Sequence, residues 1–483
     1  MRRPWLLLAS LFVACSHSSA PAGPTPIAHP RLSSPDAVVV VGRAFRDGRG
    51  RQLLFRGYNA KVNGIFDVTF DDGRTPNYTF PSLDEAGAQR MEELGFDVLR
   101  LCINWSALEP KPKGYSKDFF AKLDAVLSMA KKHHLYVLLD MHQDSWSKEI
   151  GEDGAPLWAI VPPPEKVLQG PSDDSRRLSN QVLKAGFSFY DDLPLPDGRT
   201  LQQAFIDAVS QIATHTLGND AVLGIEDFNE PVVLLDDKLQ AFHQRFADAM
   251  HAIDPDLPIF FEPIATRNQF DVANVPIDPW KNGPGAYAPH IYTGQFSVPS
   301  QNGWESEDPA KLAPSMSHAN DEAIAWGTPL FVTEFGCNVA QPRGAKWFSA
   351  ELDLQDKYLA SSTAWAWEPG DWGFPTSAGA YTSRPSLAHV VGRPYPRAIA
   401  GDLLAIERPE PGHLLVRYRA TPKTKGLAHE VSTSADAIVS WRVLCDGAPV
   451  ITTNATGRAS FTCPPVDAGE HTFELIGTAV TGG

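Results

Sequence analysis

AVLGIEDFNEPV, residues 221–232, carries the clearest structural signal in this chain of 483 residues. Its first part, 221–228, is mostly apolar and has turn-forming residues on either side, which is typical of a buried strand. Asn229, Glu230 and Pro231 end that strand, because proline cannot continue a strand ladder. A carboxylate at the last residue of a buried strand, beside an amide, is expected at the open mouth of a parallel barrel, where such folds hold their catalytic groups.

A second segment of the same design lies nearer the C-terminus. Residues 329–336, PLFVTEFG, form an apolar run that carries Glu334 near its end. Two glutamates at the ends of two different strands are the pair that glycoside hydrolysis requires, because one carboxylic acid protonates the leaving oxygen and a second carboxylate attacks the sugar or activates water. One such glutamate alone is more often an ion-pair partner. The pair, Glu230 and Glu334, favours catalysis.

The segments around these two strands alternate between strand and helix patterns. We expect strands at 53–59, 97–104, 136–142, 221–228, 258–263, 285–292, 329–336 and 361–368. We expect helices at 82–94, where Ser82 and Glu85 form a capping box, and at 117–134, 201–217, 235–253, 315–326 and 347–359. This rhythm predicts an α/β fold, a (β/α)8 TIM barrel over residues 36–399, with a long irregular segment at 143–200.

From about residue 400 the pattern changes to short alternating runs separated by Gly, Pro and Asn. This texture predicts a small β-sandwich domain over residues 400–483, which would be either a carbohydrate- or lipid-surface module or an appendage that stabilises the barrel. Cys445 and Cys463 flank a hairpin-like segment there, and we expect a disulfide between them in an oxidising compartment. Cys102 and Cys337 lie in or just after apolar strands, and we expect buried thiols.

The N-terminus has the features of a targeting segment. Two arginines precede the apolar run 5–14, which is too short to span a bilayer and is typical of a signal peptide, so residues 1–22 are assigned to this region. The sequence before Cys15 resembles a bacterial lipobox, which implies that Cys15 is lipidated; the alternative is ordinary cleavage after 20–22. Either way we expect an extracytoplasmic protein, anchored at the cell envelope or secreted, with residues 23–35 as a flexible linker.

The amino-acid composition indicates which classes of ligand the protein can bind. A net charge of −15 argues against nucleic acid, which is bound by basic surfaces, and favours a neutral substrate. The chain contains 12 tryptophans, and carbohydrate sites use such rings to stack on sugar faces. No ligand pattern typical of a metal site is present, and we expect no metal or cofactor.

Several stretches, in order along almost the whole barrel, resemble glycoside hydrolase family 5, the large family of retaining β-glycanases, and within it the endoglycoceramidases. These stretches are GFDVLRLCINWSALEP (95–110), LLDMHQDSW (138–146), GEDGAPLWA (151–159), FNEP (228–231), PHIY (289–292), VTEFG (332–336), AWAWEPGDWG (364–373) and RPYPRAIAG (393–401). The resemblance implies a retaining β-glycosidase that cuts the bond between an oligosaccharide and ceramide, with a glycolipid or oligosaccharide substrate.

The resemblance also implies roles for individual residues. Glu230 would be the acid/base and Glu334 the nucleophile. Arg100 would lie near the nucleophile, although a barrel-mouth ion pair is the alternative, and Asn229 would contact the sugar 2-hydroxyl. The remaining residues expected to contact substrate or the nucleophile are Lys61, His142, Asp144, His290, Tyr292 and Trp365.

The lipid-binding part is not determined by these motifs. The loops 61–81 and 160–200 are expected to shape a ceramide slot. Their aromatics Phe66, Phe70, Phe187, Phe189 and Tyr190 would either line an apolar groove or pack the loops onto the barrel. The other functions considered are a β-glucosidase, steryl-glucosidase or glycanase of the same family, and a non-catalytic glycan-binding lipoprotein.

Overall fold

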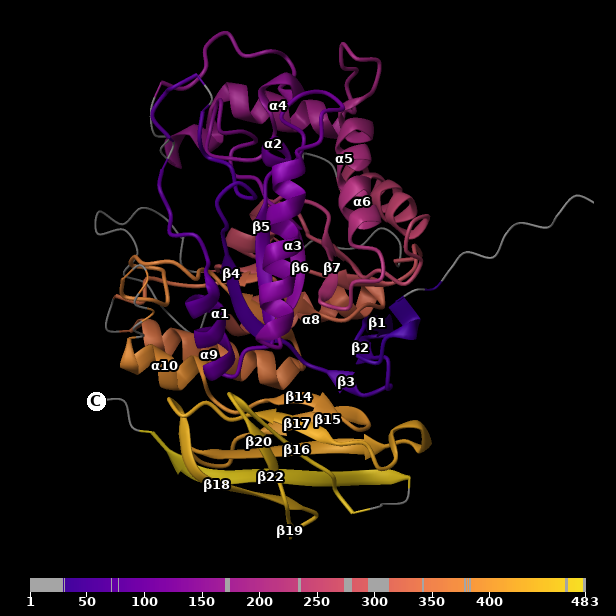
Figure 1. Ribbon diagram of the computed structural model, residues 1–483, viewed down its shortest axis with the longest axis vertical. Coiled ribbons are helices and arrows are strands. Elements are labelled where there is room, and N and C mark those ends of the chain that lie inside the picture. Colours follow the sequence, from indigo (N-terminus) through magenta and orange to yellow (C-terminus); the bar gives the residue numbers. More distant parts are fainter. Residues whose placement is uncertain are drawn as a thin grey trace, which may run out of the picture.

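The computed structural model of this protein contains a barrel and a β-sandwich that lies at one end of it (Figure 1). It describes His29 and residues 31–70, 72–76, 78–169, 174–232, 236–272, 280–293, 312–340, 343–377, 379, 381, 384–464 and 468–480. The expected signal peptide, the lipobox with Cys15 and most of the expected linker lie outside the described residues.

Eight parallel strand positions form the barrel. Their strands are β4 (Arg56–Ala60), β5 (Val98–Ile103), β6 (Tyr136–Met141), β7 (Val222–Glu226), β8 (Ile259–Phe261), β9 (Gly285–Tyr287) with β10 (His290–Ile291), β11 (Phe331–Val332) with β12 (Glu334–Phe335), and β13 (Ser361–Ala364). The hydrogen-bonded order is β11-β13-β4-β5-β6-β7-β8-β9. A bridge between Tyr287 and Leu330 and the β10–β12 pair join the two ends, so the expected TIM barrel is confirmed.

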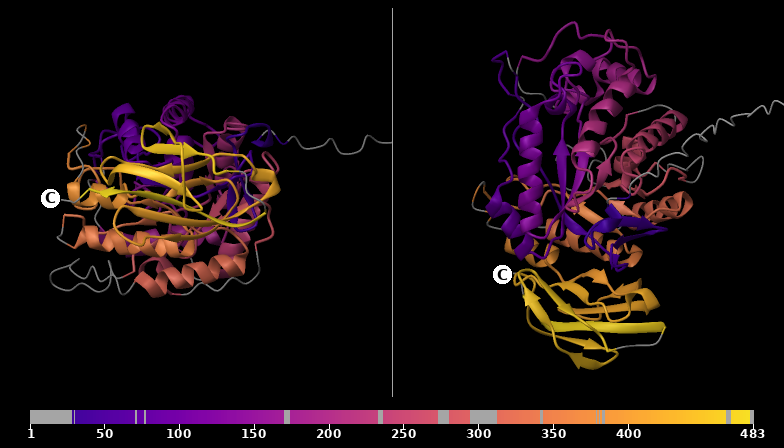
Figure 2. Two further views of the ribbon diagram at one scale, coloured as in Figure 1. Left: turned by 90° about the horizontal axis from the view of Figure 1, so that it is seen from below. Right: turned by 45° about the vertical axis from the view of Figure 1, so that its right-hand side comes forward.

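Helices surround the barrel and cover its mouth (Figures 1 and 2). They are α1 (Glu85–Glu93), α2 (Trp105–Leu108), α3 (Lys117–Lys132), α4 (Asn180–Tyr190), α5 (Leu201–His215), α6 (Asp236–His251), α7 (Ala265–Phe270), α8 (Leu312–Trp326), α9 (Gly344–Tyr358) and α10 (Pro385–Val391). The helices α2 and α4 belong to segments that leave the C-terminal ends of β5 and β6. They therefore lie on the side of the barrel where the catalytic residues were expected.

An N-terminal hairpin closes the opposite end of the barrel. It consists of β1 (Val38–Val41) and β2 (Ala44–Asp47), followed by β3 (Gln52–Leu53). Phe45 is buried there and packs on Phe55, Phe260 and Phe331, with ring centroids 5.6, 5.8 and 6.0 Å away. The hairpin therefore seals the apolar base of the barrel interior.

Two antiparallel sheets form the β-sandwich below the barrel (Figures 1 and 2). The outer sheet has the order β15-β16-β22-β18-β19, and the sheet facing the barrel has the order β1-β2-β3-β14-β17-β21-β20. The C-terminal strands are β14 (Pro396–Ile399), β15 (Asp402–Glu407), β16 (His413–Ala420), β17 (His429–Ser432), β18 (Ile438–Cys445), β19 (Ala448–Val450), β20 (Thr453–Ala455), β21 (Arg458–Phe461) and β22 (Gly469–Ala479). The expected sandwich is confirmed, and strands from both ends of the chain share one of its sheets.

Some expected elements differ from the structure. The strand expected at 53–59 begins at Arg56, because Gln52 and Leu53 pair with β14 in the sandwich instead. The helix α1 is capped by Asp84, whose side chain accepts from the backbone N–H of Gly87, while the Ser82 hydroxyl accepts from Asn63. The segment 143–200 is not irregular throughout, since it contains α4.

The strand that carries the first catalytic candidate is also shorter than expected. The strand β7 ends at Glu226, so Glu230 lies four residues beyond it rather than at its last position. The backbone N–H of Asn229 still donates to the carbonyl of Met141 on β6, at 3.1 Å. At Glu230 the backbone then turns into the left-handed region, with φ of 44°. The chain thus stays beside the neighbouring strand before it turns outward at the barrel mouth.

Candidate active site

Arg100 on β5 lies at the centre of the barrel mouth and is fully buried. Its guanidinium donates to Glu226 and Glu334, each at 2.5 Å, and lies 3.0 Å from Asp140. Burial alone would lower the pKa of Arg100, but the charges of Asp140, Glu226 and Glu334 outweigh it, and the pKa stands well above its ordinary value. Three carboxylates can therefore stay close together in a buried site because one permanent cation joins them.

Glu334 on β12 is held by two donors. Arg100 donates to one carboxylate oxygen, and the Tyr292 hydroxyl donates to the other at 2.8 Å. Burial raises the pKa of Tyr292 well above its ordinary value, and the charge of Glu334 raises it further, so the phenol keeps its proton and remains a donor. Both contacts orient the Glu334 carboxylate, the group that attacks an anomeric carbon in a retaining enzyme.

Glu230 is positioned by its backbone as well as by its side chain. Its backbone N–H donates to Glu262 at 3.2 Å, and its carboxylate lies 3.0 Å from Nδ1 of His290. The Gln143 amide donates to the carbonyl oxygens of Asn229, at 2.8 Å, and Glu230, at 3.3 Å. These contacts hold a left-handed non-glycine residue, a conformation that costs on the order of 1 kcal/mol and is characteristic of functional sites.

The spacing of the two glutamates decides between the two modes of glycoside hydrolysis. A carboxylate oxygen of Glu230 and one of Glu334 lie within 4.8 Å of each other, and a ring nitrogen of His290 lies within the same distance of each. Retaining enzymes keep their two carboxyl groups about 5 Å apart, whereas inverting enzymes need roughly 6.5–9.5 Å to admit a water molecule. The geometry is that of a retaining pair.

Asn229 faces the same centre. Its side-chain oxygen accepts from Arg100 at 2.8 Å, and its NH2 group donates to the carbonyl of Gln143 at 3.1 Å. These two bonds fix the orientation of the amide beside Glu230. Its contact with a sugar 2-hydroxyl remains a prediction from the resemblance.

His290 and Glu262 form a support behind the two glutamates. Nε2 of His290 lies 3.1 Å from Glu262, and Nδ1 lies between Glu230 and Glu334, at 3.0 and 3.5 Å. Burial alone would lower the pKa of His290, but Glu262 and Glu334 outweigh it and raise it well above its ordinary value. Sequence reasoning missed Glu262, although Glu262-Pro263 at the end of β8 repeats the Glu230-Pro231 pattern.

Four more expected residues gather on the other side of Glu334, from loops after three different strands. The ring of His142 stacks on Trp365, with centroids 5.5 Å apart and planes 7° from parallel. Nζ of Lys61 lies 4.7 Å from the centre of the Trp365 ring. Asp144 lies 3.8 Å from Nε2 of His142. The structure therefore brings all ten expected substrate-site residues, including the two glutamates, to one barrel mouth.

Two charged residues of this region were also missed. Glu368 accepts from Lys61 at 3.2 Å. Arg177 lies 3.1 Å from Asp144 and 3.9 Å from Glu230. Burial would raise the pKa of Asp144, but Arg177 and His142 outweigh it and hold it at about 2. Glu368 lies on a loop and Arg177 in a short 3-10 helix, and no apolar periodicity in the sequence marks either position.

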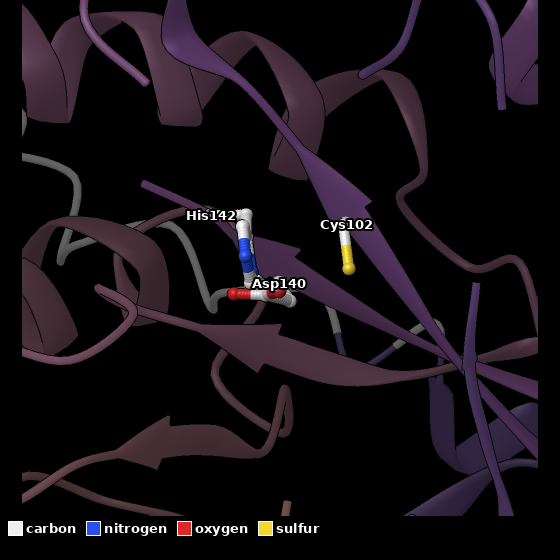
Figure 3. Close-up of side chains that lie close together, drawn as sticks. All are labelled: Cys102, Asp140 and His142. Atoms are coloured by element: carbon white, nitrogen blue, oxygen red, sulfur yellow. Dashed lines mark hydrogen bonds and ion pairs between the residues drawn. The ribbon is translucent and has the colours of Figure 1, made fainter. Parts of the chain in front are cut away.

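The cluster of Cys102, Asp140 and His142 has the residue types of a metal site (Figure 3). However, Asp140 already contacts the Arg100 guanidinium at 3.0 Å and His142 Nδ1 at 2.6 Å. Burial raises the pKa of the Cys102 thiol to about 11, so it is a neutral side chain. A metal ion would lie beside a permanent cation and without a thiolate, and the cluster instead fits a hydrogen-bonded support for His142.

A cavity of about 430 Å³ opens beside Glu230. Arg177 and Asp144 share its polar lining with Glu230, and most of its other lining residues are apolar. The buried members of the apolar lining include Trp146, Val182, Tyr190 and Phe228.

The sequence left open whether the five loop aromatics line an apolar groove or pack the loops onto the barrel, and the structure shows examples of both. Tyr190 lines this cavity, as a groove residue would. Phe66 and Phe189 are buried in apolar clusters with residues of the barrel domain, and Phe70 is buried beneath the guanidinium of Arg74 from its own loop. Phe187 is half-buried and is not among the lining residues.

The remaining cysteines lie away from this site. Cys445 and Cys463 form a disulfide in the sandwich, and Cys102 and Cys337 are buried free thiols, all as expected. Within the residues that the structure describes, no helix is long and apolar enough to cross a membrane.

Comparison with known sequences points to the same chemistry. The family model described as Cellulase (glycosyl hydrolase family 5) matches residues 62–371, more than half of the chain. Endoglycoceramidase I of Rhodococcus hoagii (strain 103S) is 27% identical over 426 residues, which cover 80% of this chain and 78% of that protein.

Solved structures share the fold over nearly the whole chain. Endo-glycoceramidase II from Rhodococcus sp., in complex with ganglioside GM3, has a TM-score of 0.75 and 22% identity, covering 91% of this chain and 100% of that one. A crystal structure of endogalactoceramidase has a TM-score of 0.72 and 23% identity, covering 92% and 100%. Barrel and sandwich thus occur together in these neighbours.

Proposed function

This chain belongs to glycosyl hydrolase family 5, and we propose that it hydrolyses the bond between the oligosaccharide and the ceramide of glycosphingolipids, with retention of configuration. The observation that carries the proposal is the apolar cavity beside Glu230. The acid/base of a glycosidase protonates the oxygen of the leaving group, so a cavity that meets Glu230 is the place for that group. An apolar lining there favours a lipid over a second sugar.

In the first step, a carboxylate oxygen of Glu334 attacks the anomeric carbon. Glu230 gives its proton to the ceramide oxygen, the bond between sugar and ceramide breaks, and a glycosyl ester forms on Glu334. Arg100 and Tyr292 hold Glu334 in place for the attack through bonds of 2.5 and 2.8 Å. Their donors also stabilise the carboxylate as it leaves again.

In the second step, Glu230 removes a proton from water, whose oxygen attacks the same anomeric carbon and releases the oligosaccharide. Arg177 lies 3.9 Å from the Glu230 carboxylate. Arg177 and Nδ1 of His290, the latter at 3.0 Å, both face the Glu230 carboxylate that acts as the base in this step.

The second candidate, a steryl-glucosidase or other β-glucosidase with an apolar aglycone, would use the same pair and the same cavity. A purely glycan-binding protein would not need a complete acid and nucleophile, and membership in the family favours an enzyme. The test is to incubate the purified chain with lactosylceramide, a ganglioside and a lipid-free aryl β-lactoside, and to identify the products by mass spectrometry.

Intact oligosaccharide together with free ceramide is the expected result. Release of a terminal sugar only, or cleavage of the aryl lactoside only, would contradict the proposal and favour the second candidate. A Glu407→Gln variant, changed at an exposed carboxylate of the sandwich, controls for substitution as such.

We further propose that the protein works outside the cytoplasm, attached to a membrane through lipidated Cys15 or secreted. The disulfide between Cys445 and Cys463 supports an oxidising compartment. Replacing Cys15 with Ala is expected to move the protein from the membrane fraction to the soluble fraction of its host. An unchanged distribution would contradict lipidation and leave the secreted form.

A further inference from the structure

Large apolar side chains surround the outer end of the cavity beside Glu230. Leu178 is 79% exposed, Phe270 is 56% exposed and Val232 is 40% exposed, and all three line the cavity. They come from three separate segments of the chain. Apolar side chains exposed together around a pocket mark a contact with an apolar partner more often than a chance surface feature.

Each of the three positions is fixed by its own backbone contacts. Leu178 ends a 3-10 helix, and the next residue, Ser179, caps α4 by accepting from the backbone N–H of Val182. Val232 follows Pro231, whose carbonyl accepts from the backbone of Ala265 at 2.9 Å. The exposure is therefore built into the fold.

Phe270 is the last residue of α7 and is fixed in the same way. The following Asp271 turns the chain in the left-handed region, with φ of 54°, and its N–H donates to the carbonyl of Arg267 at 3.0 Å. The Asp271 carboxylate contacts His318 at 2.8 Å. The backbone at Phe270 is thus fixed by the contacts of the residue that follows it.

We propose that Leu178, Val232 and Phe270 form a docking rim that inserts into the surface of a glycolipid-bearing bilayer. This proposal rests on the function proposed above, because a glycosphingolipid substrate resides in such a surface. With the rim inserted, the lipid can pass from the bilayer into the cavity without exposing its chains to water. The net charge of −15 gives the protein no overall attraction to an anionic surface, so the proposal assigns the attraction to the apolar rim.

The test uses the full chain with Cys15→Ala, which removes any acyl anchor. The test variant adds Leu178→Ser and Phe270→Ser. The matched control adds Leu157→Ser and Ile451→Ser, which replace side chains that are 46% and 93% exposed and do not line this cavity. Each protein is sedimented with phosphatidylcholine vesicles at low and high salt, and assayed on lactosylceramide both in those vesicles and dispersed in detergent.

We expect the test variant to bind vesicles at least about tenfold more weakly than parent and control, with little effect of salt. The ratio of its rate on vesicles to its rate in detergent should fall by the same order. An equal loss of rate on lactosylceramide in vesicles and in detergent would overturn the proposal, because Leu178 and Phe270 would then act only by binding the lipid inside the cavity. Unchanged vesicle binding, or an equal loss in the control, would also overturn it.

Failure of the proposed function would give a different result. A parent protein that does not cleave lactosylceramide even in detergent would contradict that function. Sedimentation of parent and variant with plain phosphatidylcholine vesicles would still test the rim, because it needs no turnover.

Discussion

At Arg100, burial and pairing depend on each other. The guanidinium would be strongly destabilising if it were buried alone, and the carboxylates of Glu226 and Glu334 would repel each other without it. Because the same guanidinium also orients Asn229, the charge state and the geometry of the site have one common origin. Substitutions at the partners of Arg100 are therefore more informative than substitutions of Arg100, which would leave several buried carboxylates unpaired.

Replacing Glu334 with Gln should abolish turnover while preserving the fold. Glutamine keeps the shape of the side chain but cannot form the glycosyl ester, so we expect kcat on lactosylceramide to fall at least about 10³-fold. The Tm should stay close to that of Glu407→Gln, an exposed control. Substantial residual turnover of lactosylceramide would show that another group is the nucleophile.

Replacing Glu262 with Gln should impair mainly the protonation of the leaving group. The variant keeps the side-chain shape near the backbone of Glu230 but removes the carboxyl group 3.1 Å from His290 whose interactions raise the pKa of His290, so that pKa should fall. We expect kcat/KM on lactosylceramide to fall about tenfold more than on a 2,4-dinitrophenyl lactoside, which needs no protonation to leave. The comparison of the two substrates is the measurement.

Glu351→Gln provides the matched control, since it changes a buried carboxylate outside the catalytic cluster. Equal losses on both substrates would mean that Glu262 has a structural role only.

The catalytic pair could be predicted from the sequence because residues at the ends of parallel barrel strands meet at one mouth. Arg100 and Tyr292 were predicted only through the resemblance to the family. Glu262 was missed even though it has the same setting, because no motif called attention to a third strand-end acid. Arg177 and Glu368 could not be predicted, since Arg177 reaches the site from a short 3-10 helix and Glu368 from a loop, and neither segment has a periodic pattern. The exposed or buried state of the loop aromatics was undetermined for the same reason.

The helix α9 carries a carboxylate whose ionisation should oppose folding. Glu351 is fully buried, and burial raises its pKa from 4.5 to about 7. A group that binds its proton more tightly when folded gives stability that is present below pH 4.5 and is lost as the pH rises through about 7. The shift corresponds to about 3 kcal/mol of unfolding free energy.

Glu351→Gln should therefore lose less stability than the parent between pH 5 and pH 8. Urea unfolding at both pH values measures this difference. Parallel losses in the two proteins would contradict a raised pKa at this position.

At the scale of elements, the sequence predicted the order and type of nearly all the barrel strands and helices, because their apolar patterns are periodic. It missed the breaks within the sixth and seventh strand positions, where the β9–β10 and β11–β12 pairs replace continuous strands. It also placed the end of β7 too late, because Phe228 continues the apolar run although the strand ends at Glu226. Hydrogen bonding, which the pattern does not contain, sets these ends.

For the molecule as a whole, the N-terminal hairpin joins the barrel and the sandwich. Phe45 packs into the base of the barrel, while β3 of the same segment pairs with β14 in the sandwich. A pairing between the two ends of the chain has no local signature in the sequence, so the expected division near residue 400 could not include it. The sandwich and the barrel should therefore depend on each other for stability.

Phe45→Ala should test this dependence. It removes a buried ring in contact with three other phenylalanines, and we expect a loss of about 3–4 kcal/mol of unfolding free energy. Val41→Ala, at a position of the same hairpin that is 55% exposed, is the control and should change stability by less than about 0.5 kcal/mol. A loss below about 1 kcal/mol for Phe45→Ala would show that the hairpin does not stabilise the barrel base.

One measurement tests both which glycosidic bond the protein cleaves and whether the released sugar keeps its anomeric configuration. The full chain is added to detergent-dispersed lactosylceramide, and proton NMR spectra are recorded before the released sugar mutarotates. We expect β-lactose to appear first, together with free ceramide, because Glu230 and Glu334 lie within 4.8 Å of each other and the apolar cavity accepts the leaving group. Initial α-lactose, or galactose with glucosylceramide, would contradict it.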